Sequence, residues 1–270
     1  MIELVVTGAG TSLCDSILEA VDSVEGDYRL RLIDAMDSAG EARRFRGRTL
    51  VIELDSEAGL ESADLVFDLN QTYNGQAVAF RPNLSLLPML RRVLAPLESG
   101  DIKMLHGVVG EPVVEHIGGV EALASQVTQL FNGRDPNPEP FGGMLAFNAR
   151  TLDESGEVNA LRSICALRHT VISLERLQTD SFYTVHASLW LQACSPAVAE
   201  SILGLGTEAY TAGLSVAPDS GRVARDEGIR VSARRVGDDW VHMMLTADLE
   251  KTIWAQEAKT ILVDALGNVQ

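Results

Sequence analysis

The first residues that could do chemistry are Gly8-Ala9-Gly10, which follow the β-rich run 2–6. Glycines between a strand and a helix let the backbone approach a pyrophosphate, and the helix N-terminus supplies positive potential. The full dinucleotide fingerprint needs a third glycine, but the chain continues Thr11-Ser12-Leu13-Cys14. A cofactor-binding loop built on Gly8 and Gly10 therefore stays open, and a turn without a ligand is the favoured interpretation of so weak a motif.

Three cysteines, Cys14, Cys165 and Cys194, offer a nucleophile in principle. Cys14 falls in the first turn of a predicted helix, where a thiolate is stabilised. Cys165 falls inside a second predicted helix, and no cysteine has a histidine at a spacing that indicates a catalytic pair. Free cysteines are among the most buried residue types, so structural packing is the favoured interpretation of all three.

The five histidines are scattered, and no HxxxH or HExxH pair indicates a metal site. His186, in an alternating β-like run, is expected to be a core or edge histidine rather than a catalytic one. An odd number of cysteines without a CxxC pair predicts neither a disulfide framework nor structural zinc. Unpaired thiols of this kind favour the cytoplasm.

The charge balance excludes several classes of partner. The chain has 270 residues with 22 Lys+Arg and 38 Asp+Glu, a net charge of −16. Such a protein repels phosphate backbones and anionic lipid, so we expect neither nucleic-acid nor membrane binding. No stretch approaches the roughly 20 apolar residues of a membrane span, and the N-terminus does not resemble a signal peptide.

The first part of the chain predicts a parallel α/β sheet. Short β-rich runs at 2–6, 28–33, 49–54 and 64–67 alternate with a helix that begins at Ser12. Ser12 and Asp15 resemble a capping box at the start of that helix.

After the Pro-rich loop at 135–143 the β-like runs are longer, and polar and apolar residues alternate along them. This pattern predicts a largely antiparallel sheet. Strands are expected at 102–109, 170–178, 182–192, 229–235 and 240–247, and helices at 84–97, 118–131, 154–168, 196–204 and 248–266.

A family resemblance is carried by three runs: Gly119-Val120-Glu121-Ala122-Leu123-Ala124-Ser125-Gln126, Leu130-Phe131-Asn132-Gly133 and, after Phe141, Leu145-Ala146-Phe147-Asn148. They resemble the aspartate-β-semialdehyde dehydrogenase family, best over residues 80–265. The resemblance implies an α/β plus α+β protein and a homodimer. A shortened Rossmann-like, dinucleotide-binding-like domain would span 1–82 with a returning helix at 248–270, and a dimerisation domain with a mixed or antiparallel sheet would span 83–247.

The family's reaction interconverts aspartyl phosphate and aspartate semialdehyde through a cysteine thioester and uses NADP. The resemblance places its nucleophile at Leu84, its substrate-binding arginine at Gln178 and its acid/base histidine at Val185. None of these side chains can perform the corresponding step, so no catalytic residue is expected. Arg162 and Arg168 lie near basic family positions and could hold an anion.

The same pattern resembles the Usg-type paralogues, which keep the dehydrogenase fold and lack its catalytic residues. We therefore expect an inactive homodimer with a structural or regulatory role, no metal, and no cofactor unless the Gly8–Gly10 loop holds NADP. A protein partner is compatible with this role.

Two alternatives stay open. One is an NADP-dependent oxidoreductase that acts on an acyl-phosphate/semialdehyde pair in amino-acid biosynthesis with a displaced thiol, Cys14 or Cys165. The other is a vestigial cofactor- or metabolite-binding module.

Overall fold

The computed structural model describes residues 1–55, 59–60, 62–73, 75–82, 86–152, 157–211 and 228–267, with the backbone alone at 157 and 206–211. The chain divides into two compact units. The first consists of Met1–Asn83 and Ile253–Gln270, and the second of Leu84–Thr252. The C-terminal segment therefore returns to the first unit. The roles expected for the two units, cofactor binding for the first and dimerisation for the second, stay predictions.

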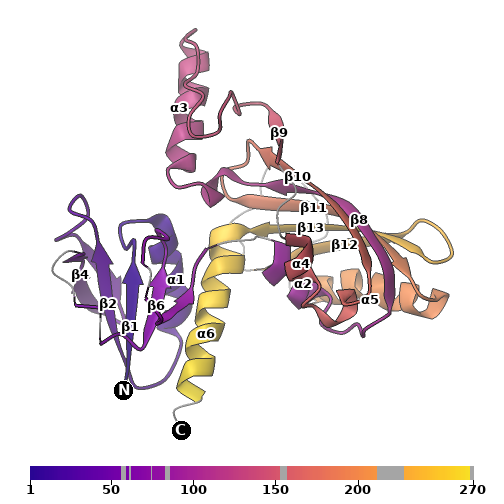
Figure 1. Cartoon of the computed structure of the whole chain (residues 1–270), viewed down its shortest axis with the longest axis horizontal. Coiled ribbons are helices and arrows are strands. Elements are labelled where there is room, and N and C mark those ends of the chain that lie inside the picture. The colour runs from indigo at the N-terminus through magenta and orange to yellow at the C-terminus, as the bar shows by residue number, and fades with distance from the viewer. Residues whose placement is uncertain are drawn as a thin grey trace. The chain divides into compact units, whose positions relative to one another are not determined.

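The first unit contains a parallel sheet of five strands in the order β5-β2-β1-β6-β7 (Figure 1). The central strand, β1, has almost no exposed residue, as expected where a parallel sheet is covered on both faces. The order places the first strand between the second and the later ones, which is the Rossmann-like arrangement. The strands are β1 (Ile2–Thr7), β2 (Tyr28–Asp34), β5 (Glu53–Leu54), β6 (Leu65–Asp68) and β7 (Val78–Phe80).

Two helices, α1 (Ser12–Asp22) and α6 (Ala255–Gly267), pack against each other in this unit. The N-cap of α1 is Thr11, whose side chain accepts a hydrogen bond from the Cys14 backbone N–H at 3.4 Å. The predicted capping box of Ser12 and Asp15 was therefore wrong. Asp15 instead forms an ion pair with Arg43 at 3.1 Å.

The single strand predicted at 49–54 is two short strands in different sheets. β4 (Arg48–Val51) forms a hairpin with β3 (Ala42–Phe45), whereas β5 pairs in parallel with β2. The turn between β3 and β4 consists of Arg46 and Gly47, and both have positive φ, as a type I′ turn requires.

The second unit contains a mixed sheet of six strands in the order β12-β13-β11-β8-β10-β9. β8 and β10 are parallel, and the other neighbours are antiparallel. The strands are β8 (Ile102–Glu111), β9 (Ala149–Leu152), β10 (Val171–Thr179), β11 (Thr184–Ala193), β12 (Arg230–Arg235) and β13 (Trp240–Asp248).

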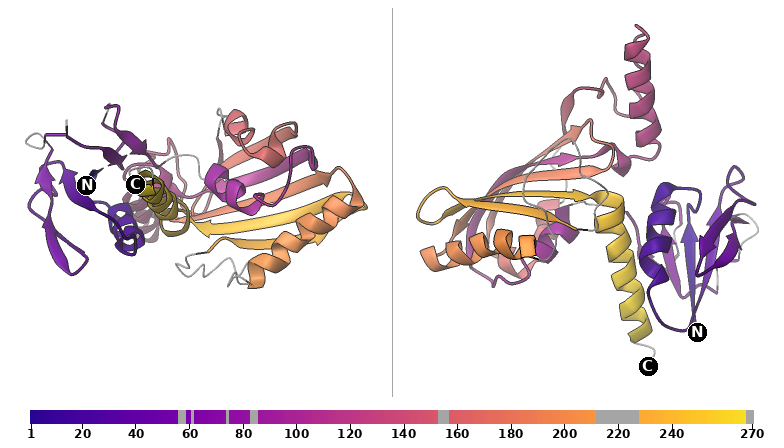
Figure 2. Two further views of the ribbon diagram at one scale, coloured as in Figure 1. Left: turned by 90° about the horizontal axis from the view of Figure 1, so that it is seen from below. Right: turned by 180° about the vertical axis from the view of Figure 1, so that it is seen from behind.

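Alternation along these strands gives the sheet one buried face and one that is only partly covered. In β11 every second residue from Val185 to Ala193 is buried, and the residues between them are half-buried. On the buried side lie α2 (Leu86–Val93), α4 (Glu157–Leu161) and α5 (Pro196–Thr211), which are seen in front of the sheet in Figure 2, left. The opposite side is called the open sheet face below.

Two helix predictions need correction. The helix predicted at 154–168 is only the short α4, which ends at Leu161 and is followed by a 3₁₀ turn at Cys165–Leu167. Residues 154–156 of that prediction lie outside the described residues. The last helix does not begin at 248, because β13 continues through Asp248. A π-helical turn, Leu249–Trp254, then leads into α6.

Residues 113–148 form an arm that extends from the end of β8 and contains α3 (Gly119–Phe131) (Figure 1). A small separate core of Val113, Leu123, Phe141, Leu145 and Ala146 holds the arm together.

The loop after α3 is attached to the helix through the buried side chain of Gln126. Its Nε2 donates to the carbonyls of Asn137 and Gly143 at 2.7 and 3.1 Å. Its Oε1 accepts from the backbone N–H groups of Leu145 and Ala146 at 2.8 and 3.1 Å. One amide group therefore satisfies four backbone groups that the loop would otherwise leave unpaired.

Replacement of Gln126 by Ala should loosen the arm. Unpaired buried backbone groups cost about 2 kcal/mol together even after partial hydration, so the α3 amides should exchange with solvent roughly thirtyfold faster. Hydrogen–deuterium exchange of the 113–148 segment measures this. The exposed Glu121→Ala change on the same helix is the control. Equal protection in the two variants would contradict the assigned role of Gln126.

Candidate functional site

The Gly8–Gly10 turn connects β1 to α1 and requires glycine at both ends. Gly8 has φ of +71°, and a Cβ there would lie 3.1 Å from the backbone N of Asn70. A Cβ at Gly10 would collide with Ser38 Oγ and lie 2.8 Å from Asp34 Oδ2. The space over this turn is therefore filled by side chains of the chain itself.

The turn does not fit a dinucleotide pyrophosphate. The Gly10 N–H, which would face a phosphate, donates to Asp34 Oδ2 at 2.6 Å. Asp34 ends β2, where a carboxylate suits a ribose hydroxyl and repels the 2′-phosphate of NADP. Asp34, 24 residues beyond Gly10, is a residue that the sequence analysis missed. An acidic residue at the end of the second strand was the signal that could have found it.

Cys14 is buried in the first turn of α1 and is not a poised nucleophile. Burial, with a contribution from the Asp15 charge, raises the pKa of its thiol to about 12. The thiolate, which is the nucleophilic form, is therefore scarce at neutral pH. Cys165 and Cys194 are both exposed, so the expectation of structural packing holds for Cys14 alone.

The structure brings Gln178 and Val185 to the same face of the mixed sheet, whereas Leu84 lies outside the described residues. Gln178 pairs with Glu111 in the register of β10 and β8. His186 pairs with Gly110 on the other edge of β8, so Val185 lies beside Glu111 on the buried face. Both Gln178 and Val185 are buried, at 3% and 0% exposure.

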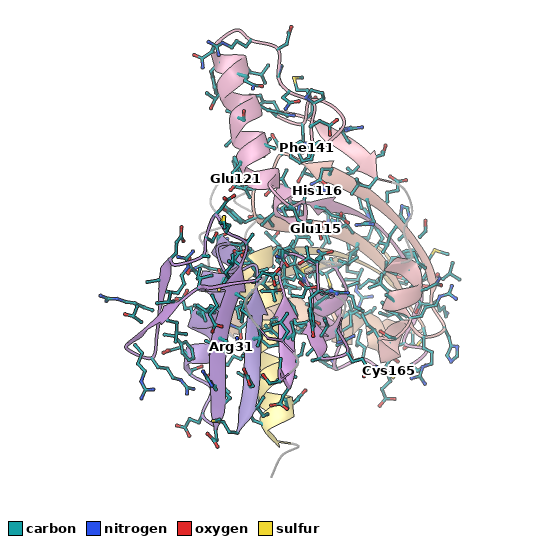
Figure 3. The ribbon with its side chains drawn as sticks, turned by 60° about the vertical axis from the view of Figure 1, so that its left-hand side comes forward. Arg31, Glu115, His116, Glu121, Phe141 and Cys165 are labelled. Carbon is teal, nitrogen blue, oxygen red and sulfur yellow. The ribbon has the colours of Figure 1, made fainter. Side chains whose placement is uncertain are left out.

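The polar side chains around Gln178 are bound to one another. Its Nε2 donates to the Glu111 carbonyl at 3.1 Å, and its Oε1 accepts from His116 Nε2. The buried Glu111 carboxylate accepts two hydrogen bonds from Arg176, one of them at 2.7 Å. His116 lies edge-on to Phe141 at the base of the arm (Figure 3).

Sequence reasoning missed Glu111, Arg176 and His116, although a lone Glu and a lone Arg in apolar strands were a signal. These residues form a polar network whose groups are all hydrogen-bonded, and the Arg176 guanidinium, which could bind an anion, is already paired with the Glu111 carboxylate.

His186, on the opposite face, has a pKa lowered by burial and is hydrogen-bonded to Thr246 at 3.4 Å. His186 therefore does not lie beside Gln178, Glu111 and Val185.

Arg162 and Arg168 are exposed, and their side chains form no ion pair with the residues that the structure describes. Arg162 follows α4, and Arg168 follows the 3₁₀ turn.

Within the described part of the chain, no group of three or more His, Cys, Asp or Glu side chains could hold a metal ion. Likewise, none of the described helices is long and apolar enough to span a bilayer.

Comparisons with known proteins identify the fold. No family model matches the chain. No curated protein matches it either. Among solved structures, a probable aspartate-semialdehyde dehydrogenase from Pseudomonas aeruginosa superimposes with a TM-score of 0.80 at 17% identity, over 100% of this chain and 99% of that one.

Two further structures agree with this match. Aspartate semialdehyde dehydrogenase II from Vibrio cholerae, complexed with ASA, has a TM-score of 0.75 at 18% identity, over 97% of each chain. The Francisella tularensis enzyme has a TM-score of 0.66 at 11% identity, over 98% of this chain and 100% of that one. The fold class is therefore confirmed: a Rossmann-like first domain and a mixed-sheet second domain of the semialdehyde dehydrogenase type.

The environments of the three thiols predict their reactivity. In the native protein a thiol reagent such as iodoacetamide should label the exposed Cys165 and Cys194 and leave Cys14 unmodified, because Cys14 is buried and protonated. Peptide mass spectrometry before and after denaturation measures the difference. Cys14→Ala should leave the native labelling unchanged. Fast native labelling of Cys14 would contradict its assigned burial.

Proposed function

We propose that this protein is a catalytically inactive homodimer with the aspartate-semialdehyde dehydrogenase fold and a structural or regulatory role, similar to the Usg-type paralogues. The observation that carries the proposal is the pair Gln178 and Val185. The family resemblance places the substrate-binding arginine and the acid/base histidine at these positions, which here hold buried, neutral side chains.

The surroundings of Gln178 support the same proposal. An anionic substrate needs a free cation at this end of the sheet, and Arg176 is engaged by Glu111. Because the buried Glu111 carboxylate neutralises Arg176, this ion pair offers no net positive charge to a phosphate. Val185 has no polar atom with which to move a proton.

Neither alternative function is favoured by a specific observation. A displaced Cys14 nucleophile would have to ionise from a pKa of about 12. A cofactor module built on Gly8 and Gly10 would have to displace Asp34 from the Gly10 amide. For an anion site at Arg162 and Arg168, the exposure of the two side chains is the only observation, and within the described residues no cavity or backbone donor beside them supports it.

The open sheet face supports the homodimer. Trp190 and His242 stack on it with ring centroids 4.6 Å apart, and Met244 lies beside them in the register with Ser188. Burial, together with the Arg234 charge, lowers the pKa of His242 and so favours its neutral imidazole. A sheet face with a large aromatic ring and a neutral histidine suits an isologous two-fold contact.

The unpaired thiols favour a cytoplasmic location, because all three cysteines are free. The net charge of −16 disfavours nucleic acid as a partner. A protein partner fits a structural or regulatory role.

The direct test of inactivity is an assay of the purified protein with aspartate semialdehyde, phosphate and NADP. We expect no NADPH above the enzyme-free rate and no calorimetric heat on titration with millimolar NADP. The Vibrio cholerae enzyme serves as a positive control. Turnover that disappears in Cys14→Ala or Cys165→Ala would overturn the proposal in favour of a displaced thiol, and heat without turnover would favour a cofactor-binding module.

The homodimer has its own test. Met244→Arg places a charge on the open sheet face and should shift the protein from dimer to monomer in sedimentation velocity, since an unpaired interfacial charge costs several kcal/mol. Val263→Arg is the matched control, because Val263 is an exposed valine of α6 in the first unit. A wild-type monomer at micromolar concentration, or dissociation in both variants, would contradict the assigned interface.

A further inference from the structure

A cavity of about 650 Å³ lies in the first unit between β2 and the hairpin strand β4. Its walls include the consecutive residues 28–32 of β2 and all of β4, Arg48–Val51. Successive residues of a strand point to opposite faces of a sheet, so a cavity that touches each of them in turn runs along the strand edges. We call it the β2–β4 groove.

The edge of β2 at this groove is unpaired. β2 pairs with β5 only through Ile33 and Asp34. The same parallel register, continued backward, would place β4 opposite residues 28–31, but β4 pairs with β3 instead. Within the described ranges, residues 28–32 therefore have no strand partner on the side away from β1. Alternate backbone N–H and C=O groups of this edge face the groove, and such an edge readily pairs with another extended chain.

The walls of the groove are basic in an otherwise acidic protein. Among the described residues, Glu53 supplies the one carboxylate, whereas four arginines line the groove: Arg29, Arg31, Arg46 and Arg48. With a net charge of −16 for the whole chain, this local excess of positive charge favours an acidic ligand.

The four arginines are not equivalent. Arg31, labelled in Figure 3, is bound to Glu3 at 2.9 Å and to Glu53 at 2.6 Å, so its charge is compensated. Arg46 lies over the Tyr28 ring, 4.8 Å from its centroid. Arg29 and Arg48 are exposed, and their guanidinium groups have no hydrogen bond or ion pair with the described residues. These two cations are available to a ligand.

We propose that the β2–β4 groove binds an acidic, extended segment of a partner protein, which adds to β2 as a further strand. The backbone of residues 28–32 supplies main-chain hydrogen bonds, and Arg29 and Arg48 select carboxylate side chains. An edge groove favours a peptide over a compact anion, because only an extended backbone satisfies the row of backbone groups along β2. This site is separate from the Gly8–Gly10 turn and does not depend on whether the protein is inactive.

The test uses the full-length protein and fluorescein-labelled peptides of about seven residues, in which Glu or Asp alternates with Val or Thr in both phases. Fluorescence anisotropy measures their binding. We expect saturable binding of at least one acidic peptide and none of the same sequences with Lys in place of each acid. Absence of binding by every acidic peptide would mean that the arginines only protect the edge, and would overturn the proposal.

Charge variants locate the site. The double change Arg29→Glu and Arg48→Glu should weaken binding about tenfold or more, because it removes two charge-assisted hydrogen bonds. The control is Arg91→Glu with Arg134→Glu, which alters the net charge by the same amount at exposed arginines of the second unit. Circular dichroism verifies that both variants fold. Equal weakening in the two double variants would show general attraction and would contradict a site in the groove.

N-methylation of the peptide backbone distinguishes strand addition from simple anion binding. A peptide N-methylated at alternate residues keeps its carboxylates but cannot pair with β2, so its affinity should fall about tenfold or more. Inorganic triphosphate should compete poorly. If the methylated peptide bound as well as the parent, or if triphosphate displaced it at equal concentration, the groove would be an anion site and the strand-addition proposal would be wrong.

Discussion

The candidate site of the second unit depends on strand β8, because β8 joins the two other strands of the site, pairing in parallel with β10 and antiparallel with β11. At its end the Glu111 carboxylate is buried, and an unpaired buried charge costs several kcal/mol. Its ion pair with Arg176 therefore constrains the register of β10 against β8. The same register sets Gln178 and Val185 on either side of Glu111. The candidate site thus follows from one ion pair and the alternation of three strands.

This constraint explains why neutral residues suit the positions of Gln178 and Val185. A second guanidinium beside Arg176 would need another counter-charge, and an imidazolium at Val185 would have to be desolvated. Functional sites bear such costs because chemistry requires them. Where the chemistry is absent, as we propose, an amide bonded to the Glu111 carbonyl and a buried valine leave the sheet fully satisfied. Gln178, Glu111 and Val185 then form an ordinary buried part of the sheet.

The sequence predicted elements whose signal is local and missed contacts that join distant residues. Periodicity placed β1, α1 and α3 correctly, because apolar spacing alone determines which side of each element is buried. It could not divide 49–54 into two strands, since only Ile52 separates β4 from β5 and their different partners, β3 and β2, leave no hydrophobic pattern. The contact of Gly10 with Asp34 spans 24 residues. That contact occupies the Gly10 amide that a cofactor phosphate would need, and only the folded chain brings the two residues together.

The arginines of the β2–β4 groove have two physical effects that support each other. Charged side chains on a strand edge oppose indiscriminate pairing, because a neutral strand that approaches must desolvate them. An acidic strand instead neutralises Arg29 and Arg48, so the same charges that exclude most chains admit one class. The open sheet face differs, since its aromatic ring and neutral His242 favour burial against a like surface. One surface selects by charge and the other by shape and apolar area, so the two contacts need not compete for the same kind of partner.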